Sequence, residues 1–182
     1  GDKMNPQQIL DFWFSPATQP HWFAQSAAFD QQVHSRFAAV LAQAAAAELA
    51  HWRATLAGRV AEIIVLDQFS RNVYRNTPQA FAQDGMALVL AQEAVAQPDF
   101  AGLPVAQRKF ALMPYMHAES ALIHEQAEPL FAALNDELTL DFERRHQQII
   151  QRFGRYPHRN AILGRSSSAE EVAFLQQPGS SF

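Results

Sequence analysis

The chain has 182 residues, of which 48% are hydrophobic and 18% charged, and its formal net charge is −4. This length suits a single domain with a sizeable core. Because cysteine is absent, a disulfide framework, a thiol nucleophile and thiolate metal ligands are excluded. The net negative charge gives no reason to expect a nucleic-acid or membrane partner. Valine, isoleucine and threonine supply only 20 residues, which argues against a large β-sheet and favours helices.

The first half of the chain carries clear helix signals. Asn5 followed by Pro6 predicts the N-cap and first position of a helix that stops before residue 15. Ser26 caps a long amphipathic segment whose apolar residues recur at helical spacing from Phe29 to Ala44. Residues 59–73 are apolar nearly all round, which predicts a central helix buried on more than one side.

Further helices are predicted in the second half. One starts near Asp84, and another runs from residue 104 to residue 113, where Pro114 breaks or kinks it. The next helix carries a stripe that includes residues 116, 119, 123 and 130, and a following one spans about 140–153, with Gly154 as its C-cap. A capping box at Ser168–Glu171 opens the last helix.

We therefore predict an all-α fold of seven to nine helices, arranged as antiparallel helical hairpins in one domain. The domain covers residues 1–182, with frayed tails at 1–4 and 177–182. The sequence carries neither a signal-peptide pattern nor an apolar stretch of about 20 residues that could span a bilayer, so we expect a cytoplasmic location.

Three polar residues interrupt apolar stripes, namely Asp67, Glu119 and His146. Burying such a group without a partner costs roughly 1–3 kcal/mol, and more for a charge, so each of them should have a partner. Arg71 follows Asp67 by four residues, the favourable order for a helical ion pair, and Arg75 lies one turn further along.

The basic residues are biased in type and position. The chain contains 12 Arg and 2 Lys, and six of the Arg lie between residues 144 and 165 together with two His and no acidic residue. A guanidinium binds carboxylate or phosphate through two parallel hydrogen bonds, which lysine cannot reproduce. These arginines either contact distant carboxylates such as Asp67 and Glu119, or leave a concave cationic site for an anion.

Other chemistries find little support. His117 and His124 are seven residues apart, which does not match the spacing of helical metal ligands, so we predict no metal site. Phosphate-binding glycine loops, nucleophile elbows and dinucleotide fingerprints are absent, and we predict no cofactor. On a regular helix His117 and Glu119 would point to opposite sides, so only an irregular turn after Pro114 would let both line one cleft.

Three segments resemble the motifs of a bacterial family, the domain-of-unknown-function family 924. They are DQFSRNVYRNTP at 67–78, MPYMHAE at 113–119, and RFGRYPHRN at 152–160 with LGR at 163–165. The resemblance covers nearly the whole chain. It implies an all-α fold similar to tetratricopeptide-like helical hairpins and no established activity.

Two positions depart from the family pattern. Ser70 stands where the motif usually has proline, and Ser120 stands where an acidic residue commonly follows Glu119. The second departure puts in doubt any mechanism that needs two adjacent carboxylates there.

Our hypothesis is that the protein binds a small anionic ligand in a cleft lined by Arg and His, and that it can be an enzyme with His as general acid or base. The predicted ligand-binding residues are Asp67, Arg71, Asn72, Arg75, Arg152, Arg155, Arg159, Asn160 and Arg165. The candidate catalytic residues are His117, Glu119, His146 and His158. The alternative is a non-enzymatic scaffold that binds a protein partner, with the Arg, Asp, Glu and His network serving only to hold helices together.

Overall fold

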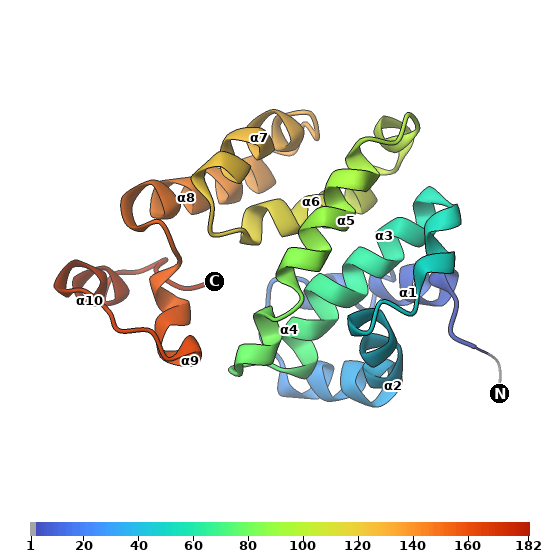
Figure 1. Cartoon of the computed structure of the whole chain (residues 1–182), viewed down its shortest axis with the longest axis horizontal. Coiled ribbons are helices and arrows are strands. Elements are labelled where there is room, and N and C mark those ends of the chain that lie inside the picture. Colours follow the sequence, from blue (N-terminus) through green and yellow to red (C-terminus); the bar gives the residue numbers. More distant parts are fainter. Residues whose placement is uncertain (1–2) are drawn as a thin grey trace.

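The computed structural model describes residues 3–182, and all regular secondary structure in that range is helical (Figure 1). The α-helices are α1 (Pro6–Trp13), α2 (Ala27–Ala45), α3 (Leu56–Ile64), α4 (Ser70–Val73), α5 (Asp84–Val95), α6 (Val105–His117), α7 (Ala121–Ala132), α8 (Glu137–Phe153), α9 (Asn160–Leu163) and α10 (Ala169–Leu175). Within the described part, α3 and α4 are joined without a break, and counting them as one gives nine helices. The all-α prediction is confirmed.

The helix ends follow the predicted capping chemistry. The Asn5 side chain accepts a hydrogen bond from the third residue of α1, and the Ser26 side chain does the same at the start of α2. Ser168 and Glu171 form the predicted capping box at α10. Gly154 ends α8 with φ of 73°, a left-handed conformation that favours glycine.

The predicted central helix is present and contains a feature that the sequence did not indicate. Between α3 and α4 the chain forms one π-helical segment, η3 (Val65–Phe69), and the two α-helices continue on either side of it. Helices α1, α5 and α6 pack against α3, while α2 packs against η3 and α4. The continuous helix formed by α3, η3 and α4, which we call the central rod, is thus covered on several sides. This burial is expected because its residues are apolar nearly all round.

One predicted helix is wrong at its start. Pro114 neither breaks nor ends a helix but lies inside α6, which continues to His117. The chain then becomes extended at Ala118, and the Ser120 side chain caps α7. Glu119 therefore lies in a short connection instead of on a helical stripe.

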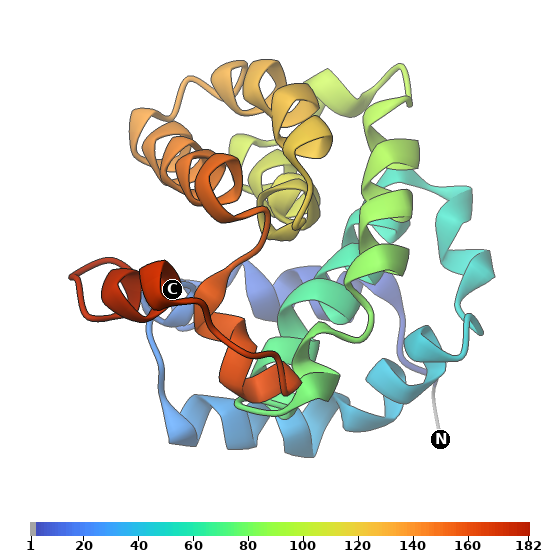
Figure 2. The same ribbon diagram turned by 60° about the vertical axis from the view of Figure 1, so that its left-hand side comes forward.

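After α8 the chain folds back beneath α7 and α8 toward the first half of the molecule (Figure 2). The 3₁₀ turn η6 (Pro157–Arg159) leads into α9 and then α10. In the segment 177–182, where we predicted fraying, the Ser180 hydroxyl donates to the Leu175 carbonyl and Phe182 packs against aromatic rings. Residues 1–2 of the other predicted tail lie outside the described range, and Met4 packs on the core. Among the described helices, none is long and apolar enough to cross a membrane.

Gly58 permits a close backbone approach that positions α3. A Cβ atom at this residue would overlap the backbone carbonyl oxygen of Trp52. We expect Gly58→Ala to destabilise the fold by about 2 kcal/mol, measured by urea unfolding. The matched control is Gly85→Ala on α5, where a Cβ meets nothing within 4 Å, so this change should stabilise by about 0.5–1 kcal/mol. Equal effects of the two substitutions would contradict the prediction.

Candidate functional site

Asp67 is a fully buried carboxylate in the π-helical segment of the central rod. Its Oδ1 accepts a hydrogen bond from His117 Nδ1 at 2.7 Å and contacts Arg71 Nη1 at 3.4 Å, and its Oδ2 accepts one from Gln68 at 2.8 Å. Burial alone would raise the pKa of Asp67, but the nearby His117 and Arg71 hold it below its usual value. The partner predicted at Arg71 is confirmed, and His117 is a second one.

From Asp67 a line of alternating charges runs to the C-terminal segment. Arg71 donates to both oxygens of Asp84, at 2.8 and 3.0 Å. Arg159 Nη1 lies 3.8 Å from an oxygen of Asp84 and 3.8 Å from one of Glu119. Arg165 then donates to both oxygens of Glu119 at 3.0 Å. We call these six side chains the charge relay: Asp67, Arg71, Asp84, Arg159, Glu119 and Arg165.

His117 is oriented by its contact with Asp67. Because the carboxylate is ionised and can only accept, Nδ1 must carry the ring proton, which leaves the lone pair on Nε2. Within residues 3–182 no group forms a hydrogen bond with Nε2, and the side chain is 15% exposed. Burial, together with Arg71, lowers the pKa of His117 against the opposing effect of Asp67. The ring is therefore neutral at pH 7 and presents a basic nitrogen.

Arg159 is the least satisfied cation of the charge relay. Its side chain is only 6% exposed, and both carboxylates near it already bind other arginines. Nη2 donates to the His117 carbonyl at 3.0 Å, whereas Nε is buried without a hydrogen-bond partner in the described structure. The guanidinium also lies 4.5 Å from the ring centroid of Phe81 and 4.8 Å from that of Tyr156.

Tyr156 connects the segment that follows α8 to helices α6 and α7. Its hydroxyl donates to the Met116 carbonyl and contacts His124 Nε2 at 2.9 Å. His124 Nδ1 in turn lies 2.8 Å from a carboxylate oxygen of the buried Glu143. The Tyr156 backbone N–H also donates to Glu119 at 2.7 Å, so this residue fixes the position of η6.

Three aromatic side chains, His146, His158 and Phe182, lie around the ring of Tyr156. The His146 ring centroid is 3.9 Å from that of Phe182 and 5.6 Å from that of Tyr156, and His158 is 4.5 Å from Phe182. Burial lowers the pKa of His146 to about 3 and that of His158 to about 4. Both rings are thus neutral over the physiological range, and His158 Nδ1 is buried with no partner among the described residues.

The comparisons with known proteins identify the family and a similar fold. Residues 9–179 match the family described as "Bacterial protein of unknown function (DUF924)". The chain belongs to this family. A solved structure of a protein of unknown function from Agrobacterium tumefaciens is similar, with 36% identity and a TM-score of 0.89 over 94% of this chain and 96% of that one. No curated protein matches.

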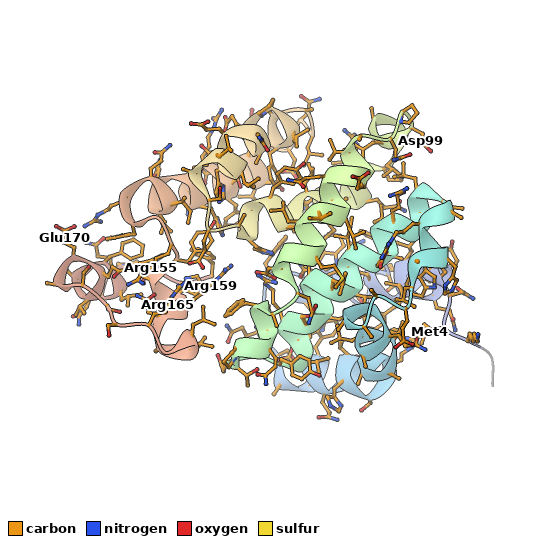
Figure 3. The ribbon with its side chains drawn as sticks, in the orientation of Figure 1. Met4, Asp99, Arg155, Arg159, Arg165 and Glu170 are labelled. Carbon is orange, nitrogen blue, oxygen red and sulfur yellow. The ribbon has the colours of Figure 1, made fainter. Side chains whose placement is uncertain are left out.

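In this DUF924 chain, several predicted site residues hold helices together away from His117. Asn72 and Arg75 both donate to Asp30 on α2, and Arg75 does not contact Asp67 because the helix ends at Val73. Figure 3 shows Arg155, Arg159 and Arg165 near one another. The other predicted residues with internal partners are Arg155, which donates to Glu171; Asn160, which donates to Ser167 and Glu171; and Arg152, which stacks on Phe153 and Phe174.

Two hollows in the surface of this DUF924 chain lie away from these residues. One, of about 280 Å³, opens between α1 and α2 and includes Asp11 and Arg36; the other, of about 260 Å³, is lined by residues of the α5–α6 connection and α7, including Phe100 and Leu134. None of the predicted site residues lines either of them. Among residues 3–182, no group of three or more His, Asp or Glu side chains is arranged to hold a metal ion.

Four residues that contact the predicted site residues were not identified as such from the sequence of this DUF924 chain: Asp84, Tyr156, Phe81 and Phe182. Asp84 was interpreted only as a helix start, and Tyr156 only as part of a motif. The acidic side chain of Asp84 could have indicated that this residue is a partner for an arginine. No local signal placed Phe81 or Phe182, because their contacts depend on the return of the chain after α8.

The Glu119 carboxylate attaches the C-terminal segment of this DUF924 chain. We expect Glu119→Gln to cost about 2–3 kcal/mol, because it removes one acceptor from Arg165 and leaves the buried Arg159 less compensated. Chemical denaturation measures this loss. Glu170→Gln is the control, since that side chain is exposed in the same segment and should change stability by less than about 0.5 kcal/mol. A loss below that limit for Glu119→Gln would contradict the prediction.

Acid should weaken this DUF924 fold in a defined pH window. The folded-state pKa values of His146 and His158 lie below the ordinary 6.5, so the unfolded chain binds more protons as the pH falls. Their contribution to stability is present above pH 6.5 and is lost toward pH 4, by at most about 1.4 kcal/mol per pH unit for each ring. His158→Gln should flatten the decline of melting temperature over this window, whereas His34→Gln, at an exposed position on α2, should not. An unchanged slope in His158→Gln would rule out this assignment.

Proposed function

We propose that the protein binds a small ligand with a singly charged anionic group beside Arg159, and that His117 acts as general base on that ligand. The observation that carries this proposal is the hydrogen bond of 2.7 Å between His117 Nδ1 and the fully buried Asp67. A buried carboxylate that fixes the tautomer of a partly exposed imidazole is a common arrangement for a catalytic base.

The location of Asp67 gives independent support. It lies in the π-helical segment, and single-turn π-helices interrupt α-helices frequently at functional sites. The irregular connection at 118–120 adds to this, because it lets the backbone carbonyl of His117 accept from Arg159. The base and the candidate anion anchor are therefore joined directly.

The charge balance limits the ligand. The charge relay contains three carboxylates and three guanidiniums, so its net charge is zero, and a dianion such as phosphate would leave two uncompensated negative charges where a monoanion leaves one. Of the three guanidiniums of the charge relay, Arg159 alone lacks a two-pronged carboxylate partner, and its Nε has a hydrogen-bonding capacity that the described residues do not use. A monocarboxylate matches a single guanidinium of this kind.

In the proposed mechanism Arg159 orients the ligand through its anionic group. His117 Nε2 removes a proton from the ligand, and Asp67 stabilises the resulting imidazolium, because its carboxylate is ionised before the transfer. Arg71 opposes that positive charge and thereby keeps the base unprotonated in the resting state. Glu119 holds Arg165 and the returning segment in place and does not act on the ligand.

An interaction scaffold is the second candidate function. It is favoured by the ion pairs Arg75–Asp30 and Arg155–Glu171, in which two predicted ligand-binding residues are already occupied. A purely structural network predicts that no small anion stabilises the protein.

The state of His117 can be measured directly by long-range ¹⁵N–¹H NMR of the imidazole rings. We expect the Nδ1–H tautomer at pH 7 and a pKa below 6.5, and Asp67→Asn should remove this tautomer preference. A ring protonated at pH 7, or one with its proton on Nε2, would show that His117 is not a base.

Ligand binding is tested by adding acetate, as the simplest monocarboxylate, and phosphate while following melting temperature and the His117 resonances. We expect acetate to raise the melting temperature and shift His117 in the wild type. Arg159→Lys keeps the charge but loses the fork geometry, and it should abolish both effects. Arg155→Lys is the matched control, because that arginine is bound to Glu171 and should leave acetate binding unchanged.

No effect of any anion on the wild type favours the scaffold instead. Loss of acetate binding in both lysine variants would contradict the assignment of Arg159 as the anion anchor.

A further inference from the structure

The ring of Phe182 occupies a position formed by three other rings. Its centroid lies 3.9 Å from that of His146, 4.5 Å from that of His158 and 5.3 Å from that of Tyr156. The rings of Tyr156 and His158 meet it at 90° and 65°, the edge-to-face arrangement that aromatic pairs prefer, and the His146 ring is tilted at 54° to it. We call His146, Tyr156 and His158 the aromatic box.

Two members of the aromatic box, His146 and Tyr156, are held independently of Phe182. His146 is held by its Nδ1, which donates to the Phe142 carbonyl at 2.6 Å, and Tyr156 is held by its hydroxyl and backbone contacts. Phe182 itself is 51% exposed although its ring lies against these side chains. His146 and Tyr156 are thus fixed by contacts other than those with Phe182, whereas the ring of Phe182 has only partial cover.

The aromatic box adjoins the proposed anion anchor. Tyr156 belongs to both, because its ring centroid is 4.8 Å from the guanidinium carbon of Arg159 and 5.3 Å from the centroid of Phe182. Arg159 is more than nine-tenths buried, and its Nε has no partner in the part of the chain described. His158 Nδ1, in the box itself, is likewise buried and unpartnered. The aromatic box therefore adjoins two polar atoms that have no hydrogen-bond partner in the described part of the chain, Arg159 Nε and His158 Nδ1.

We infer that the site takes a small aromatic monocarboxylate, whose ring enters the aromatic box in place of Phe182 and whose carboxylate binds Arg159. This inference rests on the proposed function and names its ligand class. Phe182 then acts as an internal substitute for the ligand ring, and it must leave before the ligand binds. A planar ring is specified over an aliphatic group because the box offers aromatic faces and edges on three sides.

The arrangement also explains why the chain buries two neutral imidazoles here. Neutral histidine presents an aromatic surface together with one nitrogen that can donate and one that can accept. The unpartnered His158 Nδ1 can bind a polar substituent on the ligand ring. Phe182 has no such substituent, which is consistent with the unused nitrogen.

The test measures affinities by isothermal titration of the full chain with three probes: phenylacetate, cyclohexylacetate and acetate. In the wild type we expect phenylacetate to bind most tightly and acetate most weakly. Phe182→Ala removes the competing ring, so it should tighten phenylacetate binding about threefold to tenfold while changing acetate binding little. Phe23→Ala is the matched control, since that ring is exposed but contacts no residue of the box, and it should leave all three affinities unchanged.

A second measurement locates the probe. Phenylacetate should shift the His146 and His158 ring resonances in ¹⁵N–¹H spectra, and acetate should not. Phe182→Leu serves as a second variant and should bind phenylacetate with an affinity between those of the wild type and Phe182→Ala.

The inference is overturned if acetate and phenylacetate bind equally, or if folded Phe182→Ala binds phenylacetate no more tightly than the wild type. If acetate and phenylacetate bind equally and this binding still depends on Arg159, the proposed function stands and only this inference fails. The failure of the inference and the failure of the proposed function are therefore distinguishable. If no carboxylate binds, the proposed function fails and this inference with it.

Discussion

The burial of one carboxylate, Asp67, determines how the polar residues of this fold are arranged. A charge with no access to water must be compensated nearby, and here His117 and Arg71 supply the compensation. Arg71 is itself mostly buried and contacts the Asp67 carboxylate through one nitrogen, and its guanidinium also binds both oxygens of Asp84. The same requirement repeats at Arg159, so the charge relay extends step by step from the central rod to the returning C-terminal segment.

The connection between α6 and α7 lets this relay reach a candidate base. On a continuous helix, His117 and Glu119 would point in opposite directions. Because the helix ends at His117 and the chain is extended at Ala118, one side chain turns to Asp67 and the other to Arg165. Ser120 ends the irregular stretch by capping α7. The serine that departs from the family pattern thus has a structural use, and no second carboxylate is needed there.

Much of the fold could be predicted because its signals are local. The caps at Asn5, Ser26 and Ser168 and the apolar rod at 59–73 depend on residues within a few positions of each other. The pairing of Asp67 with Arg71 was accessible for the same reason. The contacts of Asp67 with His117 and of Glu119 with Arg165 span about fifty residues, and no periodicity encodes them. The π-helical segment and the ring of Phe182 left no local signal at all.

The arginine bias of the sequence has one physical origin and two uses. A guanidinium can bind two carboxylates at once in fixed directions, so arginine, unlike lysine, can extend a chain of alternating charges. Arg165 and Arg155 each bind one carboxylate through two nitrogens and also donate to a backbone carbonyl, and in this way they hold the C-terminal segment. Arg159 lies between two carboxylates that already bind other arginines, at 3.8 Å from each. The network that stabilises the fold thus leaves one directed, partly unsatisfied cation beside a neutral histidine, and this cation is where we propose that a ligand is held.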